Sequence, residues 1–179
     1  MKLTEKTVEK RYVYRGRILQ VRCDAAQLPD GRPCVREMVE HPGGAAVIAE
    51  CEGRIALVRQ FRYPYGEEIL EVPAGKLEKG EDPARTVERE LSEETGLAAE
   101  KFVFVGEVYP TPGYTNERLY LYRAEGVRRG KEHPDDGEFL SVEWYTPAEA
   151  LEMVRDGTIK DAKTVILLLR IYGVDGTRA

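Results

Sequence analysis

The feature that most constrains this chain is an acidic segment, residues 75–97, which reads GKLEKGEDPARTVERELSEETGL. The residues at the two ends of its central part predict a helix. Asp82 can cap the first turn, Pro83 suits the first helical position, and Gly96 can end the helix in the left-handed conformation. An apolar stripe of Ala84, Val87, Leu91 and the Thr95 methyl would face a core.

Three glutamates crowd the last turn of this expected helix. At about 100° per residue, Glu90, Glu93 and Glu94 span a narrow arc beside the apolar stripe, along the seam between core and solvent. Like charges at these spacings repel by roughly 0.2–0.5 kcal/mol per pair. The helix dipole adds roughly 0.3–1 kcal/mol of penalty for each anion near the C-terminal end. A helix gains nothing structural from this arrangement, which therefore indicates a bound cation.

The donor set narrows the choice of cation. Sites built only from carboxylate oxygens suit hard cations, above all Mg²⁺ or Mn²⁺, which often bridge to phosphate oxygens of a substrate. The segment thus favours phosphate-ester or phosphoanhydride chemistry. The alternative is a solvated acidic face that Arg85, Arg89 and Lys76 neutralise.

The segment also fits a fixed pattern, Gx5Ex7REUxEExGU, in which U is a bulky aliphatic residue. The matching positions are Gly75, Glu81, Arg89, Glu90, Leu91, Glu93, Glu94, Gly96 and Leu97. This resembles the Nudix box, the signature of hydrolases that cleave nucleoside diphosphates linked to another moiety. The resemblance implies an α/β (α+β) fold in which a mixed β-sheet is sandwiched between helices, with the box as loop, helix and loop.

The same resemblance implies roles for individual residues. Glu90 and Glu94 would be the principal metal ligands, with Glu93 as a further ligand or a support for one. The backbone carbonyl of Ala74 would be another ligand, and Arg89 would orient the glutamates by ion pairing. Glu81 would brace the loop before the helix. The expected cofactor is Mg²⁺, with Mn²⁺ as a substitute.

Composition sets outer limits on the function. The chain has 179 residues, 42% of them hydrophobic, and a net charge of −5, which argues against nucleic-acid and anionic-membrane partners. We see neither a signal peptide nor a transmembrane segment. Cys23, Cys34 and Cys51 lack a CxxC spacing and are read as idle thiols of a cytoplasmic protein.

Turn residues divide the chain into elements. Extended segments are expected at 11–28 and 33–40, around a turn at 29–31, and strands at 45–51, 54–61, 68–72, 102–108, 118–124 and 139–145. Two helices follow, one capped by Thr146 with Glu149 and one starting near Asp161. We expect an N-terminal antiparallel β extension over 1–42, acting in dimerisation, and a Nudix hydrolase domain over 43–179.

The substrate must be read outside the box. Pro112, Gly113 and Glu117 lie in the stretch TPGYTNE, in which Pro112 is fifteen residues beyond Leu97. This stretch resembles the ADP-ribose pyrophosphatase subgroup. The alternative is an ordinary Pro-Gly turn. Further similarity lies in residues 39–43, 58–62, 71–76 and 161–164. It implies that Arg62 holds phosphate or terminal ribose oxygens, the alternative being a surface arginine that braces Glu67, Glu68 or Glu71.

Catalysis also needs a group that positions or deprotonates water. In related pyrophosphatases a loop glutamate does this, and it aligns best with Glu138, with Asp135 and Asp136 as alternatives. The resemblance thus assigns catalytic roles to Glu138, Glu93 and Arg89.

Adenine recognition needs an aromatic face, for which the candidates are Tyr12, Tyr14, Tyr63 and Tyr114. In the subgroup, N-terminal strands often cross a homodimer, so Tyr12 or Arg32 would act in the partner's site. His41 is interpreted as a structural hydrogen-bonding residue.

The predicted function is Mg²⁺-dependent hydrolysis of ADP-ribose to AMP and ribose 5-phosphate. Two alternatives remain. One is a pyrophosphatase for another nucleoside diphosphate sugar or a dinucleotide, such as GDP-mannose, a UDP-sugar or NADH. The other is a non-catalytic nucleotide sensor. The number of metal ions, the attacked phosphorus and the dimer geometry stay open.

Overall fold

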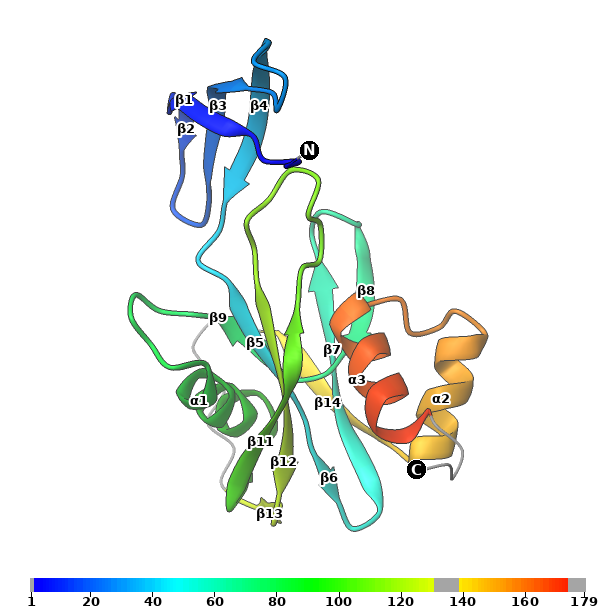
Figure 1. The fold of residues 1–179 in the computed structure, drawn as a ribbon. Helices are drawn as coiled ribbons and strands as arrows, with labels where there is room; N and C mark the ends of the chain where they lie inside the picture. Colours follow the sequence, from blue (N-terminus) through cyan, green and yellow to red (C-terminus); the bar gives the residue numbers. More distant parts are fainter. Residues whose placement is uncertain (1, 131–138, 174–179) are drawn as a thin grey trace. The chain divides into compact units, whose positions relative to one another are not determined.

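The computed structural model describes residues 2–130 and 139–173 (Figure 1). The chain divides into two units. The first combines Met1–Gly43 with Tyr109–Arg118, and the second combines Gly44–Val108 with Leu119–Ala179. The second unit contains the whole acidic segment.

The first unit is built on an antiparallel sheet. Its strands are β1 (Lys6–Glu9), β2 (Tyr12–Arg15), β3 (Gln20–Gln27) and β4 (Pro33–Glu40). β3 pairs with β4 along its whole length, while β1 and β2 pair with its C-terminal and N-terminal parts. The expected turn forms between β3 and β4, where Gly31 has a φ of 91°. The strand β1 was not predicted, because its KTVE sequence carries no turn signal at either end.

The second unit interleaves strands with helices. Its strands are β5 (Gly44–Ile48), β6 (Glu50–Cys51), β7 (Arg54–Arg62), β8 (Glu67–Glu71), β9 (Ala74–Lys76), β10 (Leu97–Ala98), β11 (Lys101–Val108), β12 (Leu119–Glu125), β13 (Arg128–Arg129) and β14 (Leu140–Tyr145). Its helices are α1 (Pro83–Thr95), α2 (Pro147–Arg155) and α3 (Ala162–Tyr172). The predicted caps of Asp82, Thr146 and Asp161 are all formed.

Two four-stranded sheets carry the described part of this unit, beside a two-stranded sheet of β10 and β13. One has the order β11-β12-β5-β9, in which β12 and β5 run parallel and the other pairs are antiparallel. The other is antiparallel, with β7 pairing β14, β6 and β8. The mixed sheet and the three helices confirm the predicted α+β class.

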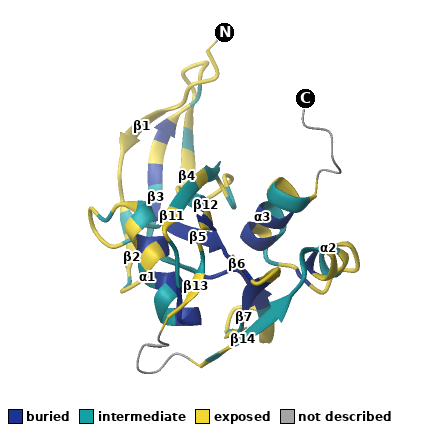
Figure 2. Ribbon diagram, turned by 90° about the horizontal axis from the view of Figure 1, so that it is seen from below, coloured by how far each residue is buried: buried dark blue, intermediate teal, exposed yellow. Residues whose placement is uncertain are grey.

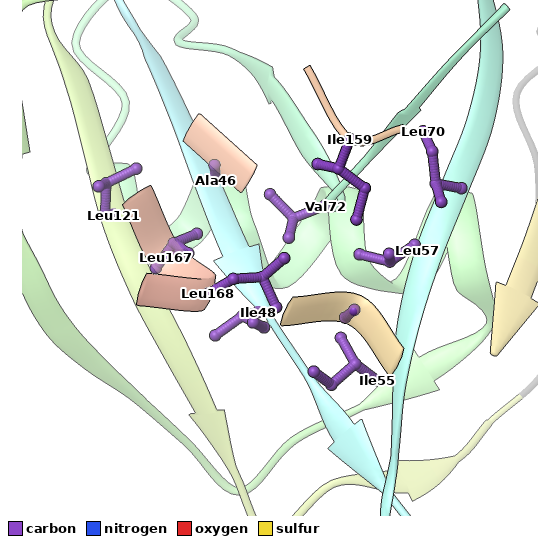
Figure 3. Packing of buried hydrophobic residues seen from close by; sticks show 11 residues of the cluster. Ala46, Ile48, Ile55, Leu57, Leu70, Val72, Leu121, Ile159, Leu167 and Leu168 are labelled. Atoms are coloured by element: carbon purple, nitrogen blue, oxygen red, sulfur yellow. The ribbon is translucent and has the colours of Figure 1, made fainter. Parts of the chain in front are cut away.

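The strand β5 is the centre of the core, and each of its residues is buried (Figure 2). Ala46 and Ile48 belong to one hydrophobic cluster, with Leu167 and Leu168 of α3 (Figure 3). Ala45 and Val47 belong to a second cluster, with Val87 and Leu91 of α1. Because neighbouring strand residues point to opposite faces, α1 and α3 cover opposite faces of β5.

The short strands were harder to predict. β9, β10 and β13 have three residues or fewer and are defined by their partners, so no local periodicity marks them. The expected single strand at 45–51 is divided into β5 and β6. In the part of the chain that the structure describes, no helix has the length and hydropathy to cross a membrane.

Candidate active site

Helix α1 presents its acids towards β9. The Asp82 side chain accepts a hydrogen bond from the Ala84 N–H, at 2.9 Å, and Gly96 ends the helix with a φ of 66°. Val87 and Leu91 are completely buried and fix the rotation of the helix. Both ends and one face of α1 are thus determined, so the direction of the carboxylates is determined as well.

Glu90 lies directly against the backbone of Gly75. A Cβ atom added to Gly75 would be 1.7 Å from Glu90 Oε1 and 2.0 Å from its carboxyl carbon. No side chain other than hydrogen fits there while Glu90 keeps this position. The glycine that opens the acidic segment therefore provides the space that the Glu90 carboxylate occupies.

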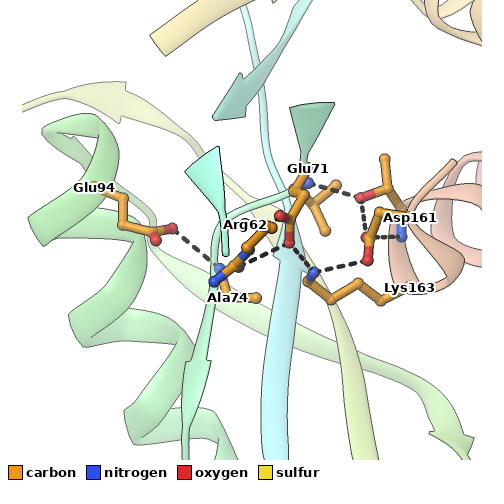
Figure 4. Close-up of polar contacts among 8 residues, drawn as sticks. Arg62, Glu71, Ala74, Glu94, Asp161 and Lys163 are labelled. Atoms are coloured by element: carbon orange, nitrogen blue, oxygen red, sulfur yellow. Dashed lines mark hydrogen bonds and ion pairs between the residues drawn. The ribbon is translucent and has the colours of Figure 1, made fainter. Parts of the chain in front are cut away.

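Glu94 contacts the residue before that glycine. Its Oε2 accepts a hydrogen bond from the Ala74 N–H at 3.1 Å (Figure 4). Glu90 and Glu94 are each only 9% exposed, whereas Glu93 is partly buried. The expectation that all three acids lie on the seam between core and solvent was thus wrong for Glu90 and Glu94. They are buried because β9 covers this end of α1.

Arg89 binds the acids together. Its Nη1 donates to Glu90 Oε1 at 2.7 Å and to Glu93 Oε2 at 3.0 Å, and its Nε lies 3.6 Å from Glu81 Oε1. Burial lowers the pKa of Arg89, but the charge of Glu90 and the contacts with Glu93 and Glu81 raise it by more. Arg89 therefore stays charged and holds three carboxylates in one cluster.

Glu81 joins this cluster to the preceding loop. Its Oε2 accepts a hydrogen bond from the Glu78 N–H at 3.0 Å. This bond is the largest cause that lowers the pKa of Glu81 below its ordinary value, and Arg89 lowers it further. Glu81 thus connects the loop before α1 to the guanidinium of Arg89, in line with its expected bracing role.

A second charged cluster contains Arg62, the residue that is expected to hold phosphate or ribose oxygens. Arg62, at the end of β7, donates from Nε to Glu71 Oε1 at 2.6 Å and from Nη2 to Glu71 Oε2 at 2.9 Å (Figure 4). The pKa of Arg62 is raised, chiefly by this pairing, with smaller contributions from the charges of Glu94 and Asp161. Of the carboxylates considered as its structural partner, Arg62 thus uses Glu71.

Helix α3 completes this second cluster. Lys163 Nζ contacts Glu71 Oε2 and also donates to Asp161 Oδ1 at 3.0 Å. Thr164 Oγ1 donates to Asp161 Oδ2 at 2.6 Å and accepts a hydrogen bond from the Val72 N–H at 2.8 Å. The end of β8, the start of α3 and Arg62 are therefore linked by polar contacts.

The sequence analysis named Glu71 only as one possible partner of Arg62 and gave Lys163 no role of its own. They are 5% and 9% exposed, respectively, so both are buried charged residues. The sequence feature that could have indicated their burial is a charged residue among apolar ones. Glu71 lies between Leu70 and Val72, and Lys163 is the second residue of the apolar helix α3. Charged residues at such positions are rarely buried without a partner.

Other candidates belong to the first unit. Pro112 and Gly113 are exposed in a turn, where Tyr114 N–H donates to the Thr111 carbonyl at 3.4 Å. Glu117 Oε1 lies 3.5 Å from His41 Nδ1. His41 Nδ1 also accepts a hydrogen bond from the Gly43 N–H at 3.1 Å, which confirms its structural interpretation.

Tyr12 and Arg32 already have partners within the first unit. The Tyr12 hydroxyl donates to Glu40 Oε2 at 2.9 Å, and the Arg15 guanidinium stacks 3.6 Å from the centre of its ring. Arg32 Nε donates to Asp30 Oδ2 at 2.7 Å on the surface. Glu138, Asp135 and Asp136 lie outside the described residues.

The acidic cluster fits a hard divalent cation by its donors. The carboxylates of Glu90, Glu93 and Glu94 supply only oxygen, and two of them are buried beside a backbone strand that has further carbonyl oxygens. Among the described residues, no three His, Cys, Asp or Glu side chains are already gathered at metal-binding distances. The residue types and their burial therefore fit a cation. In this structure the positive charge beside Glu90 and Glu93 is the guanidinium of Arg89.

Known proteins are similar to this chain in sequence or in fold. The model of the NUDIX domain matches residues 39–168, and that of the nucleoside diphosphate sugar hydrolase N-terminal domain matches residues 5–44. An ADP-ribose pyrophosphatase of Bacillus subtilis is 41% identical over 90% of this chain and 89% of its own length. A methanol dehydrogenase activator of Bacillus methanolicus is 42% identical over 90% of this chain and 89% of its own length.

A solved structure described as an ADP compounds hydrolase gives a TM-score of 0.84. It is 19% identical and covers 97% of this chain and 95% of its own chain, so it bears on the fold. The matched domain spans most of the chain and includes the whole acidic segment. The chain is a member of the Nudix family.

Proposed function

We propose that this protein hydrolyses the pyrophosphate bond of ADP-ribose to AMP and ribose 5-phosphate. The observation that carries this proposal is the burial of Glu90 and Glu94 against the backbone of β9. Their like charges repel at the unfavourable end of the helix dipole, and a cation bound between enzyme and diphosphate would offset this repulsion. The 41% identity to an ADP-ribose pyrophosphatase supports the choice of substrate.

Nudix hydrolases generally need a divalent metal ion, and we propose Mg²⁺, with Mn²⁺ as a substitute. Glu90, Glu94, Glu93 and the Ala74 carbonyl would hold it. When bound, such an ion lowers the pKa of water and neutralises charge on phosphate oxygens. The chain's own contribution is to keep the carboxylates aligned, which Arg89 does through its contacts with Glu90 and Glu93.

Arg62 is the proposed anchor for a substrate phosphate or the terminal ribose. Its guanidinium is held in one plane by two hydrogen bonds to Glu71, while its side chain remains 40% exposed. A planar, oriented guanidinium is well suited to phosphate oxygens. Arg62 would thus bind and orient the diphosphate.

The remaining roles are proposed from resemblance. Glu138 would position or deprotonate the attacking water, with Asp135 and Asp136 as alternatives, and all three lie outside the described residues. Pro112, Gly113 and Glu117 would shape the part of the site that selects ADP-ribose. Tyr12 would stack on adenine or, like Arg32, serve the site of a partner subunit.

We also propose a homodimer formed through the N-terminal strands. The sheet of the first unit exposes Val8, Val13, Tyr14 and Val35, each of them more than half exposed. Exposed apolar side chains on the strands β1, β2 and β4 suit an interface. The mass in solution, measured by light scattering for the whole chain and for Val13→Lys, tests this proposal. The free thiols of Cys23, Cys34 and Cys51 suit a cytoplasmic location.

The substrate is tested by comparing hydrolysis rates. The compounds are ADP-ribose, GDP-mannose, UDP-glucose, NADH and a dinucleoside polyphosphate, each with Mg²⁺ and with identification of the products. We expect the highest kcat/KM for ADP-ribose. A higher value for another compound would replace ADP-ribose as the substrate, and binding without release of AMP would favour a sensor.

A further inference from the structure

Arg62 faces an electrostatic conflict in its proposed role. The two hydrogen bonds from Arg62 to Glu71 fix the guanidinium, but they also place a full negative charge within 3 Å of it. A carboxylate that close cancels much of the attraction between the arginine and a phosphate. A site for an anionic substrate therefore needs something that offsets Glu71.

Lys163 supplies that offset. Its Nζ contacts Glu71 Oε2, the oxygen that Arg62 Nη2 also binds. Lys163 reaches Glu71 from α3, across 92 residues of sequence, and its side chain is 11% exposed. Burying a lysine this far carries a large desolvation cost, so its position calls for an explanation.

Asp161 does not reverse this effect. It contacts Lys163 through Oδ1, but its Oδ2 accepts hydrogen bonds from Thr164 N–H and Thr164 Oγ1 as the N-cap of α3. The positive end of the α3 dipole offsets part of its charge. Glu71 thus stays paired with two cations, one from each side.

We infer that Lys163 is a positioning residue for substrate binding: by neutralising Glu71, it lets Glu71 hold Arg62 in place while the charge of Arg62 remains available to a substrate phosphate. The inference rests on the proposed function, because it assumes that Arg62 binds phosphate. The competing explanation is that Lys163 only ties α3 to β8.

The first test replaces Lys163 with methionine, which keeps the length of the side chain and removes its charge. We expect KM for ADP-ribose to rise about 10-fold, the effect of losing about 1.4 kcal/mol of binding, with a smaller change in kcat. Lys163→Arg restores the charge and should recover most of the KM. A purely structural role would lower the melting temperature in Lys163→Met and leave KM unchanged.

A matched control is available three residues earlier. Lys160 pairs with Glu67, on the same strand as Glu71, at 3.2 Å, but its side chain is 61% exposed. Lys160→Met removes the same charge from a pair that solvent screens and that does not include Arg62. We expect it to leave KM within about 2-fold of the wild-type value.

The second test is a double-mutant cycle with inorganic pyrophosphate as the probe. The Kd of pyrophosphate with Mg²⁺ is measured by calorimetry for wild type, Lys163→Met, Arg62→Ala and the double variant. If Lys163 acts through Arg62, the Lys163→Met substitution weakens pyrophosphate binding about 10-fold in the wild-type background. The same substitution has hardly any effect on binding when residue 62 is alanine.

The outcomes separate the two proposals. Equal effects of Lys163→Met in both backgrounds, an unchanged Kd, or no pyrophosphate binding to the wild type would each overturn the inference. Coupling between Lys163 and Arg62 in a protein that does not hydrolyse ADP-ribose would support the inference and overturn the proposed function.

Discussion

Glu90 Oε1 occupies the space in which a Cβ atom of residue 75 would lie, 1.7 Å from that atom's position. Gly75 starts the acidic segment and Glu90 is near its end. Their contact therefore packs the start of the segment against the helix α1. The backbone of Gly75 does not need a left-handed φ, because the structure gives it none. Its lack of a side chain therefore serves Glu90 and not a turn.

We expect Gly75→Ala to lower kcat about 100-fold, because Glu90 must move by on the order of 1 Å to avoid the new methyl group. Steady-state kinetics with ADP-ribose measures this. The control is Gly157→Ala, at a loop glycine with a φ of 81° and no atom within 4 Å of the added Cβ. It should cost about 1 kcal/mol of stability and leave kcat unchanged. Equal kcat values in both variants would contradict the role of Gly75.

Glu94→Gln tests the metal-binding role of the acids. The glutamine oxygen can still accept the Ala74 N–H, so we expect a free energy of unfolding within about 1 kcal/mol of wild type. Turnover should fall by about 1000-fold, because a negative charge is lost from the proposed cation site. Urea unfolding and initial rates are compared on the same preparation. Near-normal turnover would rule out this assignment.

Arg89→Met removes the shared partner of Glu90, Glu93 and Glu81. Without that guanidinium the three carboxylates lose the contacts that align them, and the pKa of Glu81, which Arg89 helps to lower, rises. We expect kcat/KM to fall by about 100-fold, and more Mg²⁺ to be needed for half-maximal activity than in the wild type. A variant that loses activity with no change in its Mg²⁺ requirement would indicate that Arg89 does not act through the acids.

Glu71 makes stability depend on pH. Burial raises its pKa, but the hydrogen bond from Arg62 and the charge of Lys163 lower it by more, so the net pKa lies below the ordinary value of 4.5. A lowered pKa in the folded state stabilises the protein above pH 4.5, and the stabilisation is lost as the pH falls through the folded pKa.

We therefore expect Glu71→Gln to cost about 3 kcal/mol at pH 7 and progressively less below pH 4.5. Urea unfolding at a series of pH values measures the difference from wild type. The control is Glu67→Gln, in the exposed pair with Lys160, for which the difference should stay small at every pH. A constant difference for Glu71→Gln would contradict the pKa argument.

The sequence predicted elements that carry their own local signals. Helix α1 has its cap, its proline and its terminal glycine within one segment, so its bounds followed from the residues alone. The burial of Glu90 and Glu94 did not follow. It depends on β9, a three-residue strand that forms only because β5 offers an edge to pair with. The Glu71 and Lys163 contact joins residues far apart in sequence, which no local pattern encodes.

Hydrolysis of ADP-ribose in ¹⁸O-labelled water by the purified wild-type protein with Mg²⁺ tests the proposed function most directly. We expect equal amounts of AMP and ribose 5-phosphate, with the label in the phosphate that water attacked. We also expect that a chelator stops the release and that added Mg²⁺ restores it. No release of AMP, or release that continues unchanged in the chelator, would rule out Mg²⁺-dependent hydrolysis of ADP-ribose by this protein.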